Sequence, residues 1–305
     1  MLDGLKRLMR GESSIDFIGR SKVWLAVSLV VIGVSCIGLF GRKLNLSLEF
    51  EGGTALRVPI ANGTDVTVAD VEAALPANEI GQPDVQITTS SAGARELLVR
   101  SERIADQTTW ERVQQTVATL AGQSDVDEVN ITDVGPSWGR QVSNKALRGL
   151  IVFLVLVSIY ISLRFEWKMA AGALVALFHD LIATAGVYTL VGLEVSPATV
   201  IALLTLMGFS LYDTVVVFDK VRENVDTMTG ATRVSYSEVV NRSINQVLVR
   251  SINTSLSSVM PVAGLLFVGV YLFKADTLKD LALAMFVGAL VSTYSSIFVA
   301  SPILA

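Results

Sequence analysis

Six long apolar stretches constrain this chain more than any other feature of its sequence. They occupy residues 23–40, 147–163, 169–191, 198–218, 250–273 and 281–304. A helix needs about 20 mostly apolar residues to cross a hydrocarbon core about 30 Å thick. The composition agrees, because 51% of the residues are hydrophobic and only 17% are charged, against about 25% charged in soluble domains. The sequence therefore predicts a membrane protein built as an all-α six-helix bundle.

The first apolar stretch follows a basic start (residues 1–22, with Lys6, Arg7 and Arg10), as a signal peptide would. No small-x-small cleavage site follows it, because the chain continues with Gly41, Arg42 and Lys43. We interpret the stretch as an uncleaved anchor. The single cysteine lies inside it, which excludes an intrachain disulfide.

The charges of the short loops predict the orientation. Arg164 and Lys168 flank the loop between the second and third stretches, and residues 219–249 contain four Lys or Arg residues, Arg233 among them, whereas residues 192–197 contain none. The fifth loop is balanced, with Lys274 among its charges. Basic residues in short loops stay in the cytoplasm. We therefore expect a multi-pass protein with both termini in the cytoplasm and residues 45–144 outside.

The polar segment 45–144 has the pattern of an α+β domain. Alternation predicts a strand over 46–50, and strands are also predicted at 85–88, 97–99 and 126–132, with a turn at 90–93. Helices are predicted at 67–75, with Thr67 as a possible N-cap, and at 105–120. This βαββαβ order is the ferredoxin-like arrangement. That fold hosts many functions and names none by itself.

The loop 219–249 contains one further predicted helix. Ser235 and Glu238 form a capping-box pattern, and apolar residues follow at helical spacing on one side. This favours an amphipathic helix lying on the cytoplasmic membrane surface. An early start of the fifth membrane helix is the alternative.

Asp213 is the sharpest candidate for chemistry. Ionisable groups inside a membrane are costly and usually serve a function in the bundle interior. Asp213 lies five residues past the centre of the fourth stretch, roughly 7 Å towards the cytoplasm at 1.5 Å per residue. Burial favours the neutral form of a carboxyl group, so Asp213 is a candidate proton carrier. The alternative is a hydrogen-bonded carboxylate that only holds helices together.

Arg250 opens the fifth stretch on the same side. Turned inward, it can pair with a charged Asp213; otherwise its head reaches outward to water. The candidate lining of a polar pathway consists of Ser210, Thr214, Asn253, Thr254 and Ser257. Interhelical hydrogen bonds explain such residues equally well.

His179 and Asp180 lie near the middle of the third stretch. Histidine can shuttle protons, but a neutral histidine bonded to another helix is an equal alternative. Neighbouring helical residues point about 100° apart, so the two need not act together. At the cytoplasmic boundary, Asp219, Arg222 and Glu223 are expected to form an ion-pair network.

No pattern of an enzyme or a metal site is present. The sequence has no phosphate-binding glycine loop followed by Lys-Ser or Lys-Thr, and no Cys/His metal spacing. The net charge of −4 does not suggest a nucleic-acid partner. We therefore predict a protein without catalytic residues, metal or cofactor, powered by an ion gradient.

Several motifs resemble one family. Residues 208–224, which read GFSLYDTVVVFDKVREN, resemble the fourth-helix signature of SecF proteins, subunits of the bacterial Sec protein-export machinery. Residues 243–246 (SINQ), 250–255 (RSINTS) and 294–302 (YSSIFVASP) also match, as does the pair His179-Asp180. The chain ends soon after the sixth stretch, without the polar tail expected of such proteins, which suggests truncation.

The resemblance implies half of an assembly similar to resistance-nodulation-division exporters, in the bacterial cytoplasmic (inner) membrane. The implied partners are SecD, the SecYEG channel with SecA, in some bacteria YajC and YidC, and the translocating polypeptide. The family's fourth-helix acid falls on Asp213 and its fifth-helix arginine on Arg250. The implied function is to promote translocation or release of polypeptides at the outer face, using the proton-motive force.

The mechanism expected from this is that protonation of Asp213 loosens its attraction to Arg250 and shifts the helix packing. Two other functions stay open. One is a proton-coupled half-transporter for a lipid or a small hydrophobic molecule, and the other is a passive scaffold of the export channel.

Overall fold

The computed structural model describes residues 15–89, 95–104, 106–126, 129–228, 234–272 and 278–305. The chain divides into a helical unit, Met1–Asn45 with Arg148–Ala305, and an α+β unit, Leu46–Leu147. The basic start with Lys6, Arg7 and Arg10, the predicted turn 90–93, and the loop residues Arg233 and Lys274 lie outside the described residues.

Long helices build the helical unit. They are α2 (Ser21–Gly41), the second half of α7 (Pro136–Arg164), α8 (Trp167–Val191), α9 (Pro197–Met228), α10 (Tyr236–Gly264) and α11 (Lys279–Ser295). The π-helical segment η2 (Leu265–Leu272) continues α10, while η4 (Ser296–Ala300) and α12 (Ser301–Leu304) continue α11. The short strand β6 (Glu194–Val195) lies between α8 and α9. Six helices of the described part are long and apolar enough to cross a membrane, in agreement with the six predicted stretches.

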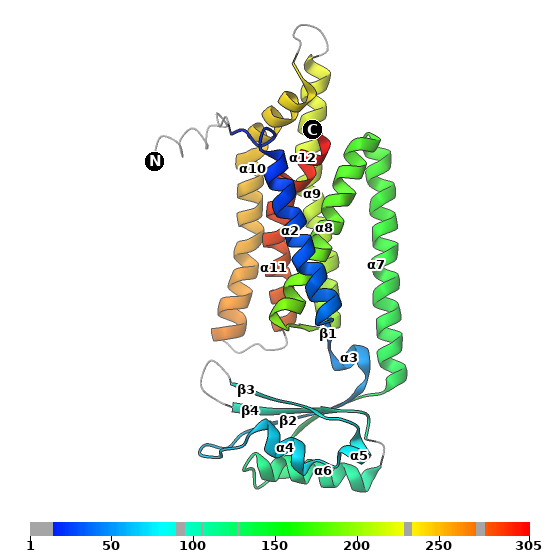
Figure 1. The fold of residues 1–305 in the computed structure, drawn as a ribbon, viewed down its shortest axis with the longest axis vertical. Coiled ribbons are helices and arrows are strands. Elements are labelled where there is room, and N and C mark those ends of the chain that lie inside the picture. Colours follow the sequence, from blue (N-terminus) through cyan, green and yellow to red (C-terminus); the bar gives the residue numbers. More distant parts are fainter. Residues whose placement is uncertain (1–14, 90–94, 105, 127–128, 229–233, 273–277) are drawn as a thin grey trace. The chain divides into compact units, whose positions relative to one another are not determined.

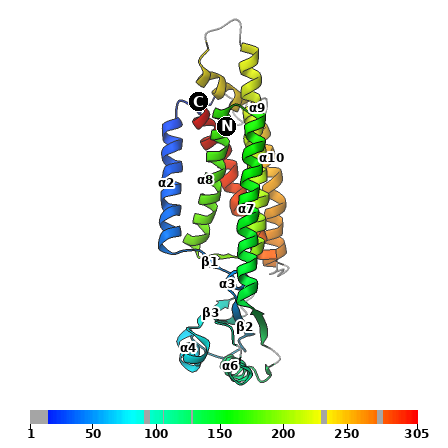
Figure 2. The same ribbon diagram turned by 90° about the vertical axis from the view of Figure 1, so that its right-hand side faces the viewer.

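The centre of this unit consists of α8, α9 and α11. In their most apolar stretches 50%, 39% and 50% of the residues are buried, against 17%, 6% and 11% for α2, α7 and α10. Figures 1 and 2 show α2 beside α8, and α11 between α8 and α10; α9 packs on both α10 and α11. Apolar residues cover most of the outer helices, as expected where lipid replaces water. Polar side chains that are buried between the central helices therefore need a reason to be there.

The predicted loop 219–249 is wrong in its bounds. Helix α9 continues past the membrane stretch to Met228, and α10 runs without a break from Tyr236, so the fifth helix begins early instead of following a separate surface helix. Ser235 caps α10 through the predicted capping box with Glu238. The apolar side of the extension is buried against α9, where Val240 and Ile244 join the core that contains Phe218 and Val221. This packing against the bundle explains the amphipathic pattern.

Residues ahead of α2 are held by the same extension. The side-chain oxygen of Asn241 accepts hydrogen bonds from the backbone N–H of Phe17 at 2.8 Å and of Ile18 at 3.2 Å. Asn245 accepts from the N–H of Ile15 at 2.9 Å and donates to its carbonyl at 2.8 Å. Phe17 itself is buried in the core. The polar side of the helix start therefore binds backbone of the same chain.

The α+β unit is a four-stranded antiparallel sheet with helices on one face (Figure 1). Its strands are β2 (Gly53–Pro59), β3 (Asp84–Thr89), β4 (Arg95–Ser101) and β5 (Asn130–Val134), in the spatial order β3-β4-β2-β5. Its helices are α4 (Val68–Ala74), α5 (Ala77–Ile80) and α6 (Gln107–Leu120). Register pairs Leu56 of β2 with Val99 of β4 and Ile131 of β5. Leu56, Val99 and Val113 of α6 are fully buried in one core.

The strand predicted over 46–50 is wrong. The strand β1 (Asn45–Leu46) is short, the helical turn α3 (Leu48–Glu51) follows, and the first long strand is β2. Gly52, at φ 77°, ends the turn. Gly139 of α7 lies against the carbonyl of Phe50, where a Cβ would come within 2.7 Å, and Ser143 donates to the same carbonyl at 3.3 Å. Contact with α7, which is distant in the sequence, therefore overrides the strand pattern of alternating apolar residues.

The other elements differ from the predictions mainly at their ends. Thr67 caps α4 in a capping box with Asp70, as expected. Helix α6 is capped by Asp106, next to the predicted start at residue 105, which lies outside the described residues. The last strand occupies Asn130–Val134 instead of 126–132, and the short helix α5 was not predicted.

Candidate functional site

Asp213 lies buried at the contact between α9 and the sixth helix. Asp213 is only 3% exposed, and its Oδ2 accepts a hydrogen bond of 2.6 Å from the hydroxyl of Ser296. Ser296 is the first residue of η4, where α11 passes into π-helical geometry. Such π-helical insertions are rare and occur often at functional sites. The carboxyl group thus contacts an irregular part of the helix that packs on it.

Asp180 forms a second buried carboxyl site one helix away. It is 6% exposed, and its Oδ2 accepts a hydrogen bond of 2.5 Å from Ser210 of α9. The Nδ1 of His179 lies 3.3 Å from its Oδ1, so the two neighbouring residues of α8 contact each other. Among the described residues, no group hydrogen-bonds the other ring nitrogen of His179. The structure therefore brings together His179, Asp180 and Ser210, all of which were candidates from the sequence.

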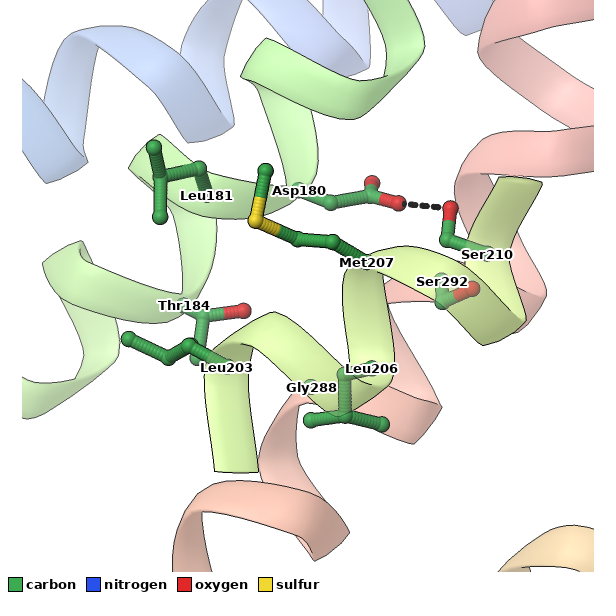
Figure 3. Close-up of a pocket in the computed structure, with 9 residues that line it drawn as sticks. All are labelled: Asp180, Leu181, Thr184, Leu203, Leu206, Met207, Ser210, Gly288 and Ser292. Atoms are coloured by element: carbon green, nitrogen blue, oxygen red, sulfur yellow. Dashed lines mark hydrogen bonds between the residues drawn. The ribbon is translucent and has the colours of Figure 1, made fainter. Parts of the chain in front are cut away.

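The two carboxyl sites share the same two helices. Ser210 and Asp213 are three residues apart on α9, and Ser292 and Ser296 are four residues apart on the sixth helix, so each pair lies about one turn apart. A cavity of about 10 Å³ lies beside Asp180 (Figure 3). Its lining includes Thr184 and Ser292, both 2% exposed. Together these side chains form a polar layer across α8, α9 and α11.

Most other predicted site residues lie apart from this layer. Arg250 is exposed and donates a long hydrogen bond of 3.4 Å to the hydroxyl of Tyr212; no ion pair with Asp213 is found in the described part of the chain. Thr254 is partly buried, and its hydroxyl bonds to the carbonyl of Arg250 at 2.8 Å. Asn253 and Ser257 are exposed along α10. Thr214 is 2% exposed, next to Asp213.

The residues of the predicted boundary network pair with Arg164 and Lys220. Asp219 pairs with Arg164 of α7 at 3.5 Å, and Arg222 donates to the carbonyl of Arg164 at 3.4 Å. Glu223 pairs with Lys220 of its own helix at 2.9 Å. These groups are mostly exposed, where such pairs contribute little stability. The network therefore links the end of α7 to the exposed part of α9 and lies apart from the buried layer.

The residues that sequence reasoning missed are mainly hydroxyls. Ser292 and Ser296 are buried opposite the two carboxyl groups, and the available signal was a run of serines within an otherwise apolar sixth stretch. Within the described ranges, no three His, Cys, Asp or Glu side chains are grouped so as to hold a metal ion.

Comparisons with known proteins agree on one family. The model of the protein export membrane protein SecD/SecF C-terminal family matches residues 113–305. Protein translocase subunit SecF of Streptomyces coelicolor is 42% identical over 301 residues, which cover 98% of this chain and 78% of that protein. Protein translocase subunit SecDF of Thermus thermophilus is 34% identical, and the alignment covers 95% of this chain.

A solved structure agrees with the sequence relatives. The crystal structure of SecDF from Thermus thermophilus, described as a translocon-associated membrane protein, superimposes with a TM-score of 0.79 at 32% identity. The match covers 96% of this chain and 38% of the SecDF chain. The match extends over both units and includes the helices that carry Asp180 and Asp213. The chain therefore belongs to the SecD/SecF family of protein export membrane proteins and is similar to its SecF members.

Proposed function

We propose that this chain works with a SecD-type partner and uses the proton-motive force to promote translocation or release of polypeptides at the outer face of the Sec channel. The observation that carries the proposal is the buried Asp213, held between α9 and the sixth helix by one hydroxyl from Ser296. A carboxyl group with so few partners is costly in its charged form. Uptake of a proton relieves that cost and changes what the group attracts.

The proton is the energy source in this proposal, and Asp213 is the group that couples it to movement. Each charge that crosses the membrane releases about 2.3 kcal/mol per 100 mV. In the observed arrangement Ser296 takes the place expected of Arg250, so protonation acts first on the contact between α9 and η4. Arg250 contacts Tyr212, the residue next to Asp213 on α9.

Two observations support a SecD partner. The Thermus thermophilus relative carries the name SecDF, and the present chain matches only 38% of it. In addition, Arg250, Asn253 and Ser257 are exposed along α10, in a segment predicted to cross the membrane. Polar groups that face lipid are costly, and a second helical subunit would cover them. We extend the proposal to SecYEG with SecA, and in some bacteria YajC and YidC.

The proposal also covers the membrane location of the chain and the fold of the α+β unit. We place the chain in the bacterial cytoplasmic membrane with both termini inside and the α+β unit outside. We assign that unit to the ferredoxin-like fold, because its βαββαβ order and its strand order β3-β4-β2-β5 fit two split βαβ units.

The test is export of a secreted reporter in cells whose only copy carries Asp213→Asn, with protein level and SecD association measured. We expect export to fall to the level of the deletion strain while the complex stays intact, because asparagine cannot titrate. Asp219→Asn is the matched control on the same helix, at an exposed position, and should export normally.

Normal export by the Asp213→Asn strain would contradict proton coupling through this residue. If deletion of the gene still abolished export, the passive scaffold would then be the better reading. If the Asp213→Asn strain instead lost resistance to a hydrophobic compound but exported normally, the half-transporter would be favoured.

A further inference from the structure

A small cavity beside Asp180 lies among α8, α9 and the sixth helix (Figure 3). Its volume of about 10 Å³ is close to the smallest that holds one water molecule. Four of the nine lining residues carry side-chain oxygen atoms, namely Asp180, Thr184, Ser210 and Ser292, and the others are Leu181, Leu203, Leu206, Met207 and Gly288. The cavity is therefore small and partly polar.

The hydroxyl of Ser292 needs a hydrogen-bond partner in this cavity. Ser292 is 2% exposed, and in the described part of the chain no protein group hydrogen-bonds its Oγ. A buried hydroxyl without a partner is costly, and most such groups in proteins are satisfied by protein or by ordered water. Ser292 and Asp180 line the same cavity, so one molecule placed there can serve both.

The groups around Asp180 define what that molecule is. One carboxylate oxygen accepts from Ser210 at 2.5 Å and the other lies 3.3 Å from His179, yet each oxygen has a second lone pair to offer. Hard cations take six or more oxygen ligands, more than this lining supplies. A water molecule needs only two to four polar partners.

We infer that this cavity binds a single water molecule, which bridges the carboxyl group of Asp180 on α8 to the hydroxyl of Ser292 on the sixth helix. The inference rests on the proposed function, in which protons move through this layer. The water donates a hydrogen bond to Asp180. A proton that the gradient delivers to this water passes on to the carboxylate of Asp180, which becomes neutral while the water returns to its own neutral form.

The bridge extends the proton-handling layer beyond Asp213. Asp180 is then a hydrated carboxyl group, and its neighbours Ser210 and Ser292 lie about one helix turn from Asp213 on α9 and from Ser296 on the sixth helix. Other titratable groups of these three helices include His179 on α8, which contacts Asp180, Asp213 on α9, and Tyr294 on α11, whose ring centroid lies 5.9 Å from that of His179. Asp180 thereby becomes a second proton-exchanging residue.

The experiment uses the complete chain in its complex with the SecD partner, in two measurements. An experimental density map that resolves ordered water should show one water between Asp180 and Ser292 in the natural protein and lose it in Ser292→Ala. Proton-driven export of a reporter should then fall several-fold in Ser292→Ala and in Thr184→Val.

Two control variants match these changes. Thr189→Val removes a hydroxyl of α8 that is equally buried but bonds to the carbonyl of Gly186 at 2.9 Å. Ser251→Ala removes a buried hydroxyl of α10 that also lacks a protein partner among the described residues but does not line the cavity. Both controls should export at the natural rate.

Three results would overturn the inference. The first is a map of the natural protein that shows no density in the cavity. The second is density that appears only when sodium is present. The third is export by Ser292→Ala at the same rate as by the two controls. Failure of the proposed function is distinct, because it appears as normal export in Asp213→Asn whatever the map shows. Loss of export in Asp213→Asn together with an unaffected Ser292→Ala rejects the water relay alone.

Discussion

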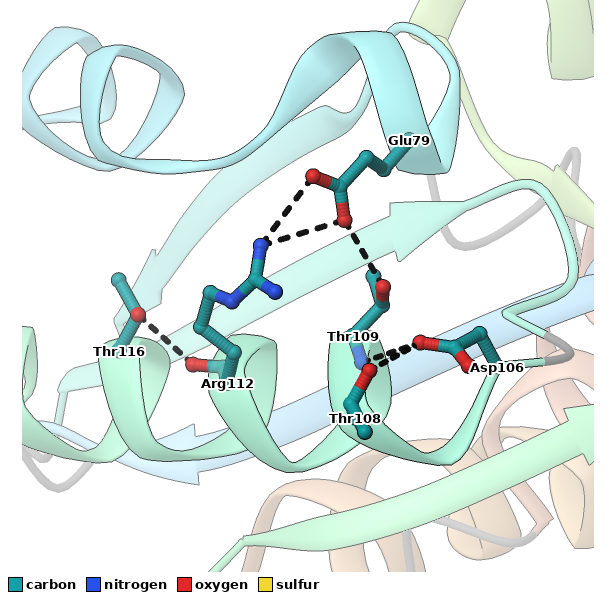
Figure 4. A network of polar contacts seen from close by, with 6 residues as sticks. All are labelled: Glu79, Asp106, Thr108, Thr109, Arg112 and Thr116. Carbon is teal, nitrogen blue, oxygen red and sulfur yellow. Dashed lines mark hydrogen bonds and ion pairs between the residues drawn. The ribbon is translucent and has the colours of Figure 1, made fainter.

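Asp106 shows how a single exposed residue organises the start of a helix in the α+β unit (Figure 4). Its Oδ2 accepts hydrogen bonds from the hydroxyl of Thr108 at 2.5 Å and from the backbone N–H of Thr109 at 2.8 Å. These bonds, led by that of Thr108, lower the pKa of Asp106 to about 2. Glu79 of α5 joins by accepting from Thr109 at 2.8 Å and from Arg112 at 3.2 Å. The first turn of α6 is therefore fixed to α5.

This cap predicts a local response to mutation and pH. A carboxyl group whose pKa is lowered by folding stabilises the fold above its unfolded pKa, about 3.9, and the effect is lost as the pH falls towards the folded value. The cap should thus persist at pH 5 and weaken only between about pH 4 and pH 2. Asp106→Ala should increase amide exchange at the start of α6 at neutral pH, measured by hydrogen–deuterium exchange of the whole chain.

Asp106→Asn is the control, because an amide oxygen still caps a helix. Equal exchange in the alanine and asparagine variants would show that Glu79 and Arg112 alone hold the turn.

The candidate site was predictable only in part. Asp180 and Asp213 stand out because carboxyl groups are rare in apolar stretches. Ser210 was among the predicted polar residues, but its pairing with Asp180 and that of Ser296 with Asp213 were not predictable, because serine is common in such stretches and only helix packing decides which hydroxyl meets which carboxyl group. The orientation of Arg250 also depends on packing, since a long side chain reaches either inward or outward from the same position.

At the scale of helices and strands, long periodic patterns predicted more than short ones. The six apolar stretches correspond to six helices, because the lipid core demands about 20 apolar residues of each. The alternation at Leu46, Leu48 and Phe50 was misleading, since a few residues satisfy both a strand and a helical turn, and contact with Gly139 selects the turn. The early start of α10 likewise follows from its packing on α9, which local sequence does not reveal.

The pair α2 and α8 depends on close approach of small residues. A Cβ at Gly186 of α8 would collide with the hydroxyl of Ser35 and would lie 2.6 Å from its Cα. A Cβ at Gly38 of α2 would likewise come within 2.7 Å of the hydroxyl of Thr189. Membrane helices use such small residues because no hydrophobic driving force holds helices together in lipid, so tight packing must do it.

Gly186→Ala should therefore separate α2 from α8. The collision involves backbone of the facing helix, which cannot rotate away, and overpacking of this kind costs about 1–3 kcal/mol. The measurement is the unfolding free energy of the purified chain in detergent. Gly33→Ala on α2 is the control, because nothing lies within 4 Å of its Cβ position and alanine favours a helix. If the unfolding free energies of Gly186→Ala and Gly33→Ala are equal, the close approach of α2 and α8 at Gly186 is refuted.

For the whole molecule, the two units have separate cores and share one long helix. Leu56 and Val113 belong to the core of the α+β unit, and Phe218 and Ile244 to that of the helical unit. Helix α7 (Pro136–Arg164) begins in one unit and ends in the other. Because a helix transmits displacement along its axis, α7 provides a physical connection through which the proposed proton step can act on the α+β unit.

That connection has its proposed meaning only if the two units lie in different compartments. The single cysteine, Cys36, makes a direct measurement simple, since Cys36→Ser leaves a chain without thiols. In that background, Glu72→Cys reports on an exposed position of α4 and Glu166→Cys on the exposed loop between α7 and α8. A membrane-impermeant maleimide should label Glu72→Cys in intact spheroplasts and leave Glu166→Cys unlabelled, while both should react after the membrane is dissolved.

The expected result follows from the basic residues Arg164 and Lys168 beside Glu166, which favour a cytoplasmic position of that loop. Labelling of Glu166→Cys in intact spheroplasts, with Glu72→Cys protected, would invert the chain. The α+β unit would then lie in the cytoplasm, and a role at the outer face of the channel would be excluded even if Asp213 carries protons. Labelling of Glu72→Cys alone would place the unit where an emerging polypeptide can meet it.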